Sequence, residues 1–132
     1  MRNRLLLFAA AFALGVGTYA VGSSVNHPQE QKPKQFALLM KATGPEFFKK
    51  IEEPEGKRLV AEHFKKLQAL TAQGVCVFSG HTLVTDDSGF GIIVVRVDSE
   101  AAAQKIIDDD DLVKAGLVRG TIFPFQVVTF AK

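Results

Sequence analysis

Two kinds of hydrophobic pattern divide the chain. The first 25 residues combine a cationic start with an almost unbroken apolar run from Leu5 to Val21. From residue 35 onward, short apolar runs alternate with amphipathic stretches, which is the pattern of a folded domain. Residues 26–34 hold two prolines among mixed polar residues and are typical of an extended linker. We therefore expect one domain over residues 35–132, joined by this linker to an N-terminal segment.

The N-terminal segment, residues 1–25, has the order of an export signal. Two arginines come first, then the apolar run, and then the small polar residues Gly22-Ser23-Ser24. The apolar run is about as long as the shortest helix that spans a bilayer, so an uncleaved membrane anchor is the alternative. In both cases the arginines stay inside and the domain faces outward. We expect an exported protein, periplasmic or secreted, that contacts the membrane only through this segment if it is retained.

Short runs rich in apolar or β-branched residues predict four strands. They cover residues 36–40, 75–79, 90–97 and 121–130. The turn residues Asp86-Asp87-Ser88-Gly89 join the second and third runs as a hairpin. Pro124 has no backbone donor, so we expect the last strand at a sheet edge or a bulge.

Two longer segments carry the start and stop signals of helices. Residues 54–72 begin with a proline, which a first helical turn tolerates, and Gly74 follows as a terminator. Residues 100–109 form the second helix, with Ser99 as its N-cap, and a shorter helical turn is expected over residues 46–53. The order βαββαβ predicts an α+β, ferredoxin-like fold with an antiparallel sheet.

Composition and charge exclude several classes of protein. The chain has 132 residues, of which 47% are hydrophobic and 23% charged, as in one globular domain. Beyond Arg2 and Arg4, the remaining lysines and arginines equal the 14 acidic residues in number. A neutral domain without a basic stripe argues against nucleic-acid binding. Cys76 is the single cysteine, so no internal disulfide forms, and no Cys/His cluster predicts a metal site.

His63 is the most informative residue of the predicted first helix. At about 100° per residue it falls on the apolar face, with Val60, Phe64 and Leu67. A lone imidazole in such a place is most often a core histidine bonded to a backbone carbonyl. The acids Asp108–Asp111 follow the second helix, where they oppose the helix dipole. One of them could fold back onto His63 and make it a general acid/base, but spacing alone does not select which.

Two further places are candidates for contact with a ligand. Ser79 and His81 lie at the end of a predicted strand, where loops commonly carry function, although an exposed histidine is the simpler interpretation of His81. Phe123, Phe125 and Val127 alternate onto one face of the last strand. That face predicts an apolar pocket or a surface for a partner.

Four groups of residues follow one another in a fixed order from Gln35 to Phe130. They are Glu62-His63, then Gly74 with Phe78-Ser79-Gly80, then the helix over residues 99–109, and then Asp110 to Gly116 leading to Pro124-Phe125. In this order and spacing they resemble the YCII-related family of small dimeric α+β barrel proteins. The resemblance covers nearly the whole of the predicted domain.

The resemblance implies a ferredoxin-like domain whose sheets pair in a homodimer. It also implies that His63 and Asp110 form the active site, and we take Ser79, His81 and Phe125 as candidate substrate contacts. The few enzymes of the family include one that eliminates hydrogen chloride from a chlorinated hydroxyquinol. Lyase-like or isomerase-like chemistry on a small molecule, with no cofactor and no metal, is what this implies.

Two positions depart from the family's pattern. Asp111 and Leu112 stand where a proline and an aromatic residue usually follow the aspartate, and His81 stands where a proline usually follows Gly80. These changes retain the histidine–aspartate pair and alter the shape of its pocket. Two alternatives stay open. The domain is a non-catalytic small-molecule-binding or interaction module of the same fold, or the pair is structural and pins the first helix to the loop before the last strand.

Overall fold

Residues 34–131, the part of the chain that the computed structural model describes, form four strands and four helices. The strands are β1 (Lys34–Ala42), β2 (Cys76–His81), β3 (Gly91–Val97) and β4 (Val118–Phe125). The helices are α1 (Phe47–Glu52), α2 (Pro54–Ala72), α3 (Glu100–Asp108) and α4 (Asp111–Lys114). The predicted order βαββαβ is present, and α4 is an additional short helix.

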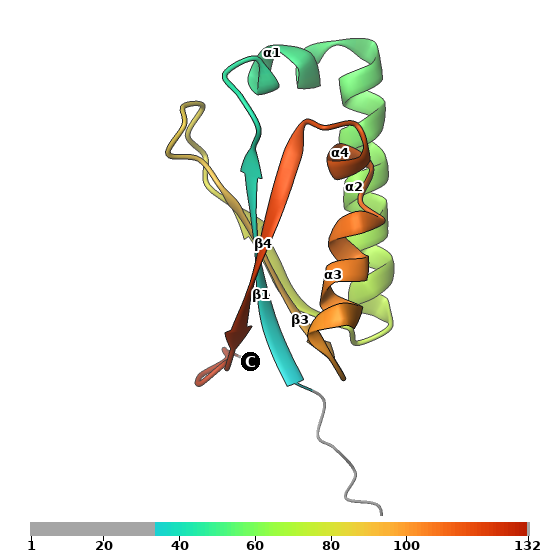
Figure 1. The fold of residues 1–132 in the computed structure, drawn as a ribbon, viewed down its shortest axis with the longest axis vertical. Coiled ribbons are helices and arrows are strands. Elements are labelled where there is room, and N and C mark those ends of the chain that lie inside the picture. The colour runs from blue at the N-terminus through green and yellow to red at the C-terminus, as the bar shows by residue number, and fades with distance from the viewer. Residues whose placement is uncertain (1–33, 132) are drawn as a thin grey trace, which may run out of the picture.

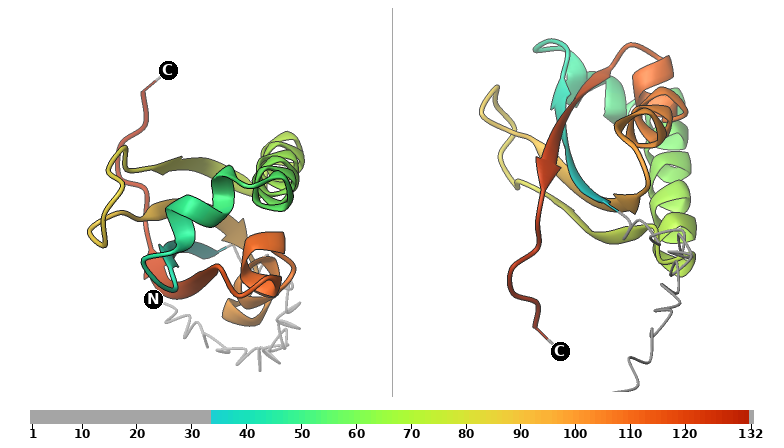
Figure 2. Two further views of the ribbon diagram at one scale, coloured as in Figure 1. Left: turned by 90° about the horizontal axis from the view of Figure 1, so that it is seen from above. Right: turned by 60° about the horizontal axis from the view of Figure 1, so that its bottom comes forward.

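The strands form one antiparallel sheet in the order β2-β3-β1-β4. Figures 1 and 2 show α2 and α3 on the same face of this sheet and α1 near one end of it. This is the ferredoxin-like arrangement that the element order predicts, and the α+β fold is confirmed.

The core lies between the sheet and the helices. Leu38 of β1 and Ile93 of β3 are paired neighbours at its centre, and Leu67 of α2 and Ile107 of α3 cover them. Each such side chain contributes roughly 1.5–3 kcal/mol when it is fully buried. This burial fixes the orientation of α2, because the side of α2 that carries Leu67 must face the sheet.

The residues predicted to begin and end the two longer helices are confirmed. Pro54 opens α2, and Gly74 follows its end with a φ of 72°, a conformation that only glycine adopts readily. Ser99 caps α3, because its hydroxyl accepts a hydrogen bond from the backbone N–H of Ala102 at 3.1 Å. Gly116, with a φ of 71°, turns the chain from α4 into β4.

The acidic run Asp108–Asp111 does not simply follow a helix end, as the sequence suggested. It spans the junction between α3 and α4, so that Asp110 is the N-cap of α4 and Asp111 lies in its first turn. Carboxylates are favourable at a helix N-terminus. The expected unfavourable dipole interaction is therefore wrong for these two residues.

The last strand also differs from its predicted range of residues 121–130. It begins at Val118 and ends at Phe125, which pairs with Gln35 near the start of β1. Beyond that pair, Val127 donates its N–H to the side chain of Gln35 at 2.7 Å. The prediction that Pro124 lies on an edge strand is confirmed, because β4 pairs with β1 alone.

The predicted signal or anchor over residues 1–25 lies outside the described residues, as does the linker up to residue 33. Within the described residues the first element, β1, begins at Lys34. None of the helices within residues 34–131 is both long enough and apolar enough to cross a membrane.

Candidate active site

The fold brings His63 of α2 against Asp110, which lies 47 residues later between α3 and α4. The Nδ1–H of His63 donates a hydrogen bond to Oδ2 of Asp110 at 2.5 Å. Both side chains are largely buried, with exposed fractions of 14% and 8%. Of the four acids at the junction, Asp110 is therefore the one that meets the histidine.

The second carboxylate oxygen of Asp110 is held by the start of α4. Oδ1 accepts hydrogen bonds from the backbone N–H groups of Leu112 at 2.9 Å and of Val113 at 3.4 Å. Such a cap contributes about 1 kcal/mol to helix stability. Because each oxygen has its own donor, the carboxylate is fixed in the orientation that it presents to His63.

The other ring nitrogen of His63, Nε2, is available to a ligand. Within residues 34–131, every buried side-chain nitrogen or oxygen has a hydrogen-bond partner, and no bond from Nε2 to these residues is present. Nε2 is therefore accessible. Since Nδ1 carries the proton shared with Asp110, Nε2 of the neutral ring has a free lone pair and can accept a proton.

His63 lines a pocket of about 780 Å³ on the helix-covered side of the sheet. The pocket lies between α1, the first half of α2, the loop after β2 and the strands β2 and β3. Its volume is in the range of small-molecule sites, about 300–1,000 Å³. Most of its walls are apolar, and its polar side chains are Glu52, His63, Ser79, His81, Thr82 and Thr85.

Ser79 and His81 line this pocket, as the sequence suggested. They pair with Ile93 and Gly91 of β3, and they lie on the side of the sheet that the helices cover. Nδ1 of His81 donates to the carbonyl oxygen of Thr82 at 2.9 Å, which leaves Nε2 of His81 as an acceptor in the neutral ring. The pocket is therefore lined by two imidazoles whose Nε2 atoms form no hydrogen bond with the described residues.

Phe64 stands beside both imidazoles. Its ring centroid is 5.3 Å from that of His63 and 6.4 Å from that of His81. The sequence placed Phe64 on the core face of α2, but 43% of the residue is exposed. It forms part of the pocket wall, because α2 covers the sheet with Leu67 and turns its flank toward the β2–β3 loop.

The structure does not bring Phe125 to this pocket. Phe125 and Phe123 lie on the face of β4 that points away from the helices, and neither lines the cavity. The alternation of residues in β4 explains this, because Val118 and Ile122 take the helix-facing positions. Within one copy of the chain, Phe125 has no contact with the His63 site.

Sequence reasoning missed the contribution of α1. Phe47, Phe48 and Ile51 line the pocket, although α1 has no buried residue of its own. A pair of phenylalanines in a short helix between two prolines was the available signal, since such a helix needs a neighbour for its apolar side. The structural reason lies in Gly56 of α2, where a Cβ atom would approach the carbonyl oxygen of Lys50 to 1.9 Å.

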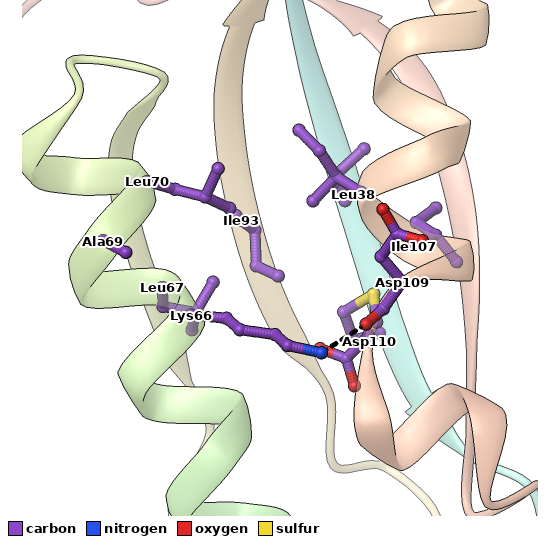
Figure 3. A pocket seen from close by; sticks show the side chains of 11 residues that line it. Leu38, Lys66, Leu67, Ala69, Leu70, Ile93, Ile107, Asp109 and Asp110 are labelled. Carbon is purple, nitrogen blue, oxygen red and sulfur yellow. Dashed lines mark hydrogen bonds between the residues drawn. The ribbon is translucent and has the colours of Figure 1, made fainter.

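A smaller cavity of about 250 Å³ lies next to Asp110, between α2 and α3 (Figure 3). It shares Met40, Leu67 and Ile93 with the larger pocket. Lys66 reaches across its rim toward Asp109 (Figure 3). Within residues 34–131 no group of three or more His, Cys, Asp or Glu side chains is arranged to hold a metal ion.

Comparison with known proteins identifies the family. A model of the YCII-related domain matches residues 35–126, so the chain belongs to the YCII-related family and the predicted resemblance is confirmed. The fold is similar to that of 5-chloro-2-hydroxyhydroquinone dehydrochlorinase (TftG) from Burkholderia phenoliruptrix AC1100, solved in complex with 2,5-dihydroxybenzoquinone. The TM-score is 0.54 at 20% sequence identity, and the match covers 70% of this chain and 93% of that one. None of the curated proteins matches this chain.

Proposed function

We propose that the protein is an exported YCII-like domain that binds a small molecule and uses His63 as a general acid/base oriented by Asp110. The observation that carries this proposal is that the two ring nitrogens of His63 have different surroundings. Nδ1 is held by a buried carboxylate while Nε2 is accessible in a pocket of about 780 Å³. A fixed tautomer with its lone pair directed at a ligand is what proton abstraction requires.

The proposed proton transfer follows from the different roles of these two nitrogens. Nε2 takes a proton from a C–H or O–H group of the ligand, and the carboxylate of Asp110 stabilises the imidazolium that forms. The imidazolium then returns the proton to a leaving group, which is a lyase reaction, or to another atom of the ligand, which is an isomerase reaction. The likeness of fold to a dehydrochlorinase supports the first of these. Neither step requires a cofactor.

Ser79 and His81 complete the proposed site as substrate contacts. They offer a hydroxyl group and an imidazole nitrogen, while the aromatic walls contributed by Phe47, Phe48 and Phe64 suit a compact apolar body. A few polar groups in a mostly apolar pocket fix the orientation of a ligand. We expect a small molecule that has an acidic hydrogen near His63 and a polar group near His81.

Export and dimerisation belong to the same proposal. The cationic and apolar segment over residues 1–25 supports export. The sheet face opposite the helices supports a homodimer, because Phe78, Phe123 and Phe125 are exposed there. An apolar face of this kind is usually covered by a partner.

The first test screens the purified chain for ligands by thermal shift. A panel of small phenols, quinols, lactones and oxoacids is compared on wild type, His63→Ala and Asp110→Asn. A ligand at a hundred times its dissociation constant stabilises the native state by about 2.7 kcal/mol, which raises Tm by roughly 11–22 °C in a domain of this size. We expect both substitutions to reduce that shift strongly. Lys65→Ala, on the exposed side of α2, should retain it.

Catalysis is tested on the ligand so found. Exchange of its acidic hydrogen with D2O, followed by NMR, should be fast with wild type and lower by about 10² or more with His63→Ala. A ligand that binds without exchange or turnover supports the non-catalytic module instead. If no ligand binds and both variants unfold more easily than wild type, the pair is structural.

A further inference from the structure

The His63–Asp110 contact joins two parts of the fold that are far apart in the sequence. His63 belongs to the long helix α2, whereas Asp110 lies in the short junction between α3 and α4. The hydrogen bonds at the start of α4 orient the carboxylate within its own segment. They do not fix the distance between that segment and α2.

Lys66 forms polar contacts from α2 to the junction between α3 and α4. It lies three residues after His63, so it projects from nearly the same side of α2. Its ammonium donates a hydrogen bond to the backbone carbonyl of Asp109 at 2.6 Å and lies 2.7 Å from Oδ2 of Asp111. Figure 3 shows the side chain extending from α2 to the junction, with the bond to Asp109 dashed. The two partners of Lys66 are the residues on either side of Asp110.

We propose that Lys66 is a positioning residue of this site, which holds Asp110 at hydrogen-bonding distance from His63 by binding both of its neighbours. The inference rests on the proposed function, because positioning matters only if the pair serves a ligand. Lys66 itself acts through Asp110 and does not contact the reacting atoms.

Three features separate this contact from an ordinary surface ion pair. The carbonyl of Asp109 is at the C-terminal end of α3, where a cation is favoured and where a backbone acceptor needs a donor. The side chain of Lys66 lines the smaller cavity together with Leu67 and Leu70, so its aliphatic part lies beside apolar side chains. The side chains of Lys66 and Asp111 are 42% and 25% exposed, so the pair is partly shielded from solvent.

The same junction provides a matched control. Lys105 forms an ion pair with Asp109 at 2.8 Å, but both residues belong to α3 and its C-cap. Lys105 therefore adds a positive charge to the acidic run without connecting it to α2. A role for Lys66 that is only electrostatic would be shared by Lys105, whereas a positioning role would not.

The test measures how often the pair opens. In the full chain with 15N-labelled histidine, the exchange rate of the His63 Nδ1 proton with water is followed by NMR, and the signal is assigned by its absence from His63→Ala. Lys66→Met keeps the aliphatic part and removes the charge. We expect it to accelerate exchange roughly fivefold, which corresponds to the loss of a modest ion pair. Lys105→Met should leave the rate unchanged, and Lys66→Arg should restore most of the protection.

The proposal is wrong if Lys66→Met leaves the exchange rate unchanged, or if Lys105→Met accelerates it as much. Should Lys66→Met fail to fold, Asp111→Asn removes the same ion pair from the other side and is measured in its place. The readout needs no ligand. A wild type that binds and converts nothing would therefore contradict the proposed function, and the exchange rates would still decide the role of Lys66.

Discussion

Asp110 performs two tasks with its two carboxylate oxygens. One oxygen caps α4 and the other holds the imidazole of His63. An asparagine at this position could keep the cap, but its amide nitrogen would face Nδ1 as a donor. The imidazole would then need its proton on Nε2, where it could no longer accept one from a ligand. The amide variant therefore separates the role of Asp110 in the fold from its role in the proposed chemistry.

The ion pair beside Asp110 predicts how stability depends on pH. The hydrogen bond from Lys66 lowers the pKa of Asp111, and the bond to Asp111 raises the pKa of Lys66. A carboxylate with a lowered folded pKa stabilises the fold above its unfolded pKa, about 3.9, and this contribution is lost as the pH falls through the folded value. A lysine with a raised folded pKa stabilises the fold below its unfolded value, about 10.4, and loses this contribution at higher pH.

Asp111→Asn should therefore be less stable than wild type across the neutral range, about pH 5 to 9, and should approach it in acid. Urea unfolding of both proteins at neutral and at acidic pH measures the difference. The control is Asp87→Asn, in the turn after β2, which removes a carboxylate that forms none of the ion pairs among the described residues. A difference between Asp111→Asn and wild type that stays constant from neutral to acidic pH, or that equals the difference for Asp87→Asn at each pH, would contradict the prediction.

At the scale of elements, α1 depends on one glycine of α2. Gly56 is buried, and a Cβ atom there would come within 1.9 Å of a carbonyl oxygen and 2.6 Å of the Cα atom of Ile51. No L-residue fits at these distances without moving the backbone of α1. Since α1 supplies Phe47, Phe48 and Ile51 to the pocket, the packing of these two helices shapes the proposed site.

Gly56→Ala should therefore affect both stability and ligand binding. We expect a loss of roughly 1–3 kcal/mol, typical of overpacking, together with weaker binding in the pocket as α1 is displaced. Denaturant unfolding and ligand titration measure the two effects. Gly44→Ala is the control, because nothing lies within 4 Å of a Cβ atom there. Equal behaviour of the two variants would show that α1 accommodates the methyl group.

The elements that the sequence predicted well are those with local signals. Pro54, Gly74 and Ser99 act within a few residues of their own positions, so the limits of α2 and the start of α3 followed from the sequence. The limits of β4 did not, because they depend on which residues of β1 pair with it, from Ala42 with Val118 to Gln35 with Phe125. The helix α4 was missed because four acids in a row were interpreted as one helix end, whereas the chain starts a second helix at Asp110.

The candidate site, like the fold, was predictable only where the signal is local in the sequence. Helical periodicity places His63 on the side of α2 that faces the sheet, and this is local information. The choice of Asp110 among four acids depended on the family resemblance, since a contact across 47 residues has no trace in local spacing. Phe64 and α1 were assigned to the core or to a turn, because only the packed structure shows which apolar side chains a cavity leaves partly uncovered.

At the scale of the whole molecule, the pocket and the open sheet face are on opposite sides. Figures 1 and 2 show the helices on one face of the sheet, and the His63 pocket is lined from that side by α1, α2 and Ile93 of β3. Val94 and Ala37 form the centre of the other face, with Phe123 of the edge strand β4 beside them. Val94 and Ala37 are buried although they face away from the helices, but 48% of Phe123 remains exposed. A second copy placed against this face would cover Phe123 and would lie on the side of the sheet opposite to the helices.

This arrangement predicts that assembly and ligand binding are separable. Light scattering at micromolar concentration should give twice the mass of the chain for wild type, and Phe123→Asp should give the single mass, because a carboxylate on the covered face would be desolvated without a partner. Ala101→Asp, which adds the same charge on the exposed side of α3, should remain dimeric. Ligand affinity should be nearly unchanged in Phe123→Asp, since no residue of β4 beyond Val118 lines the pocket. A monomeric wild type would contradict the dimer, whereas a loss of affinity on dissociation would show that the second copy completes the site.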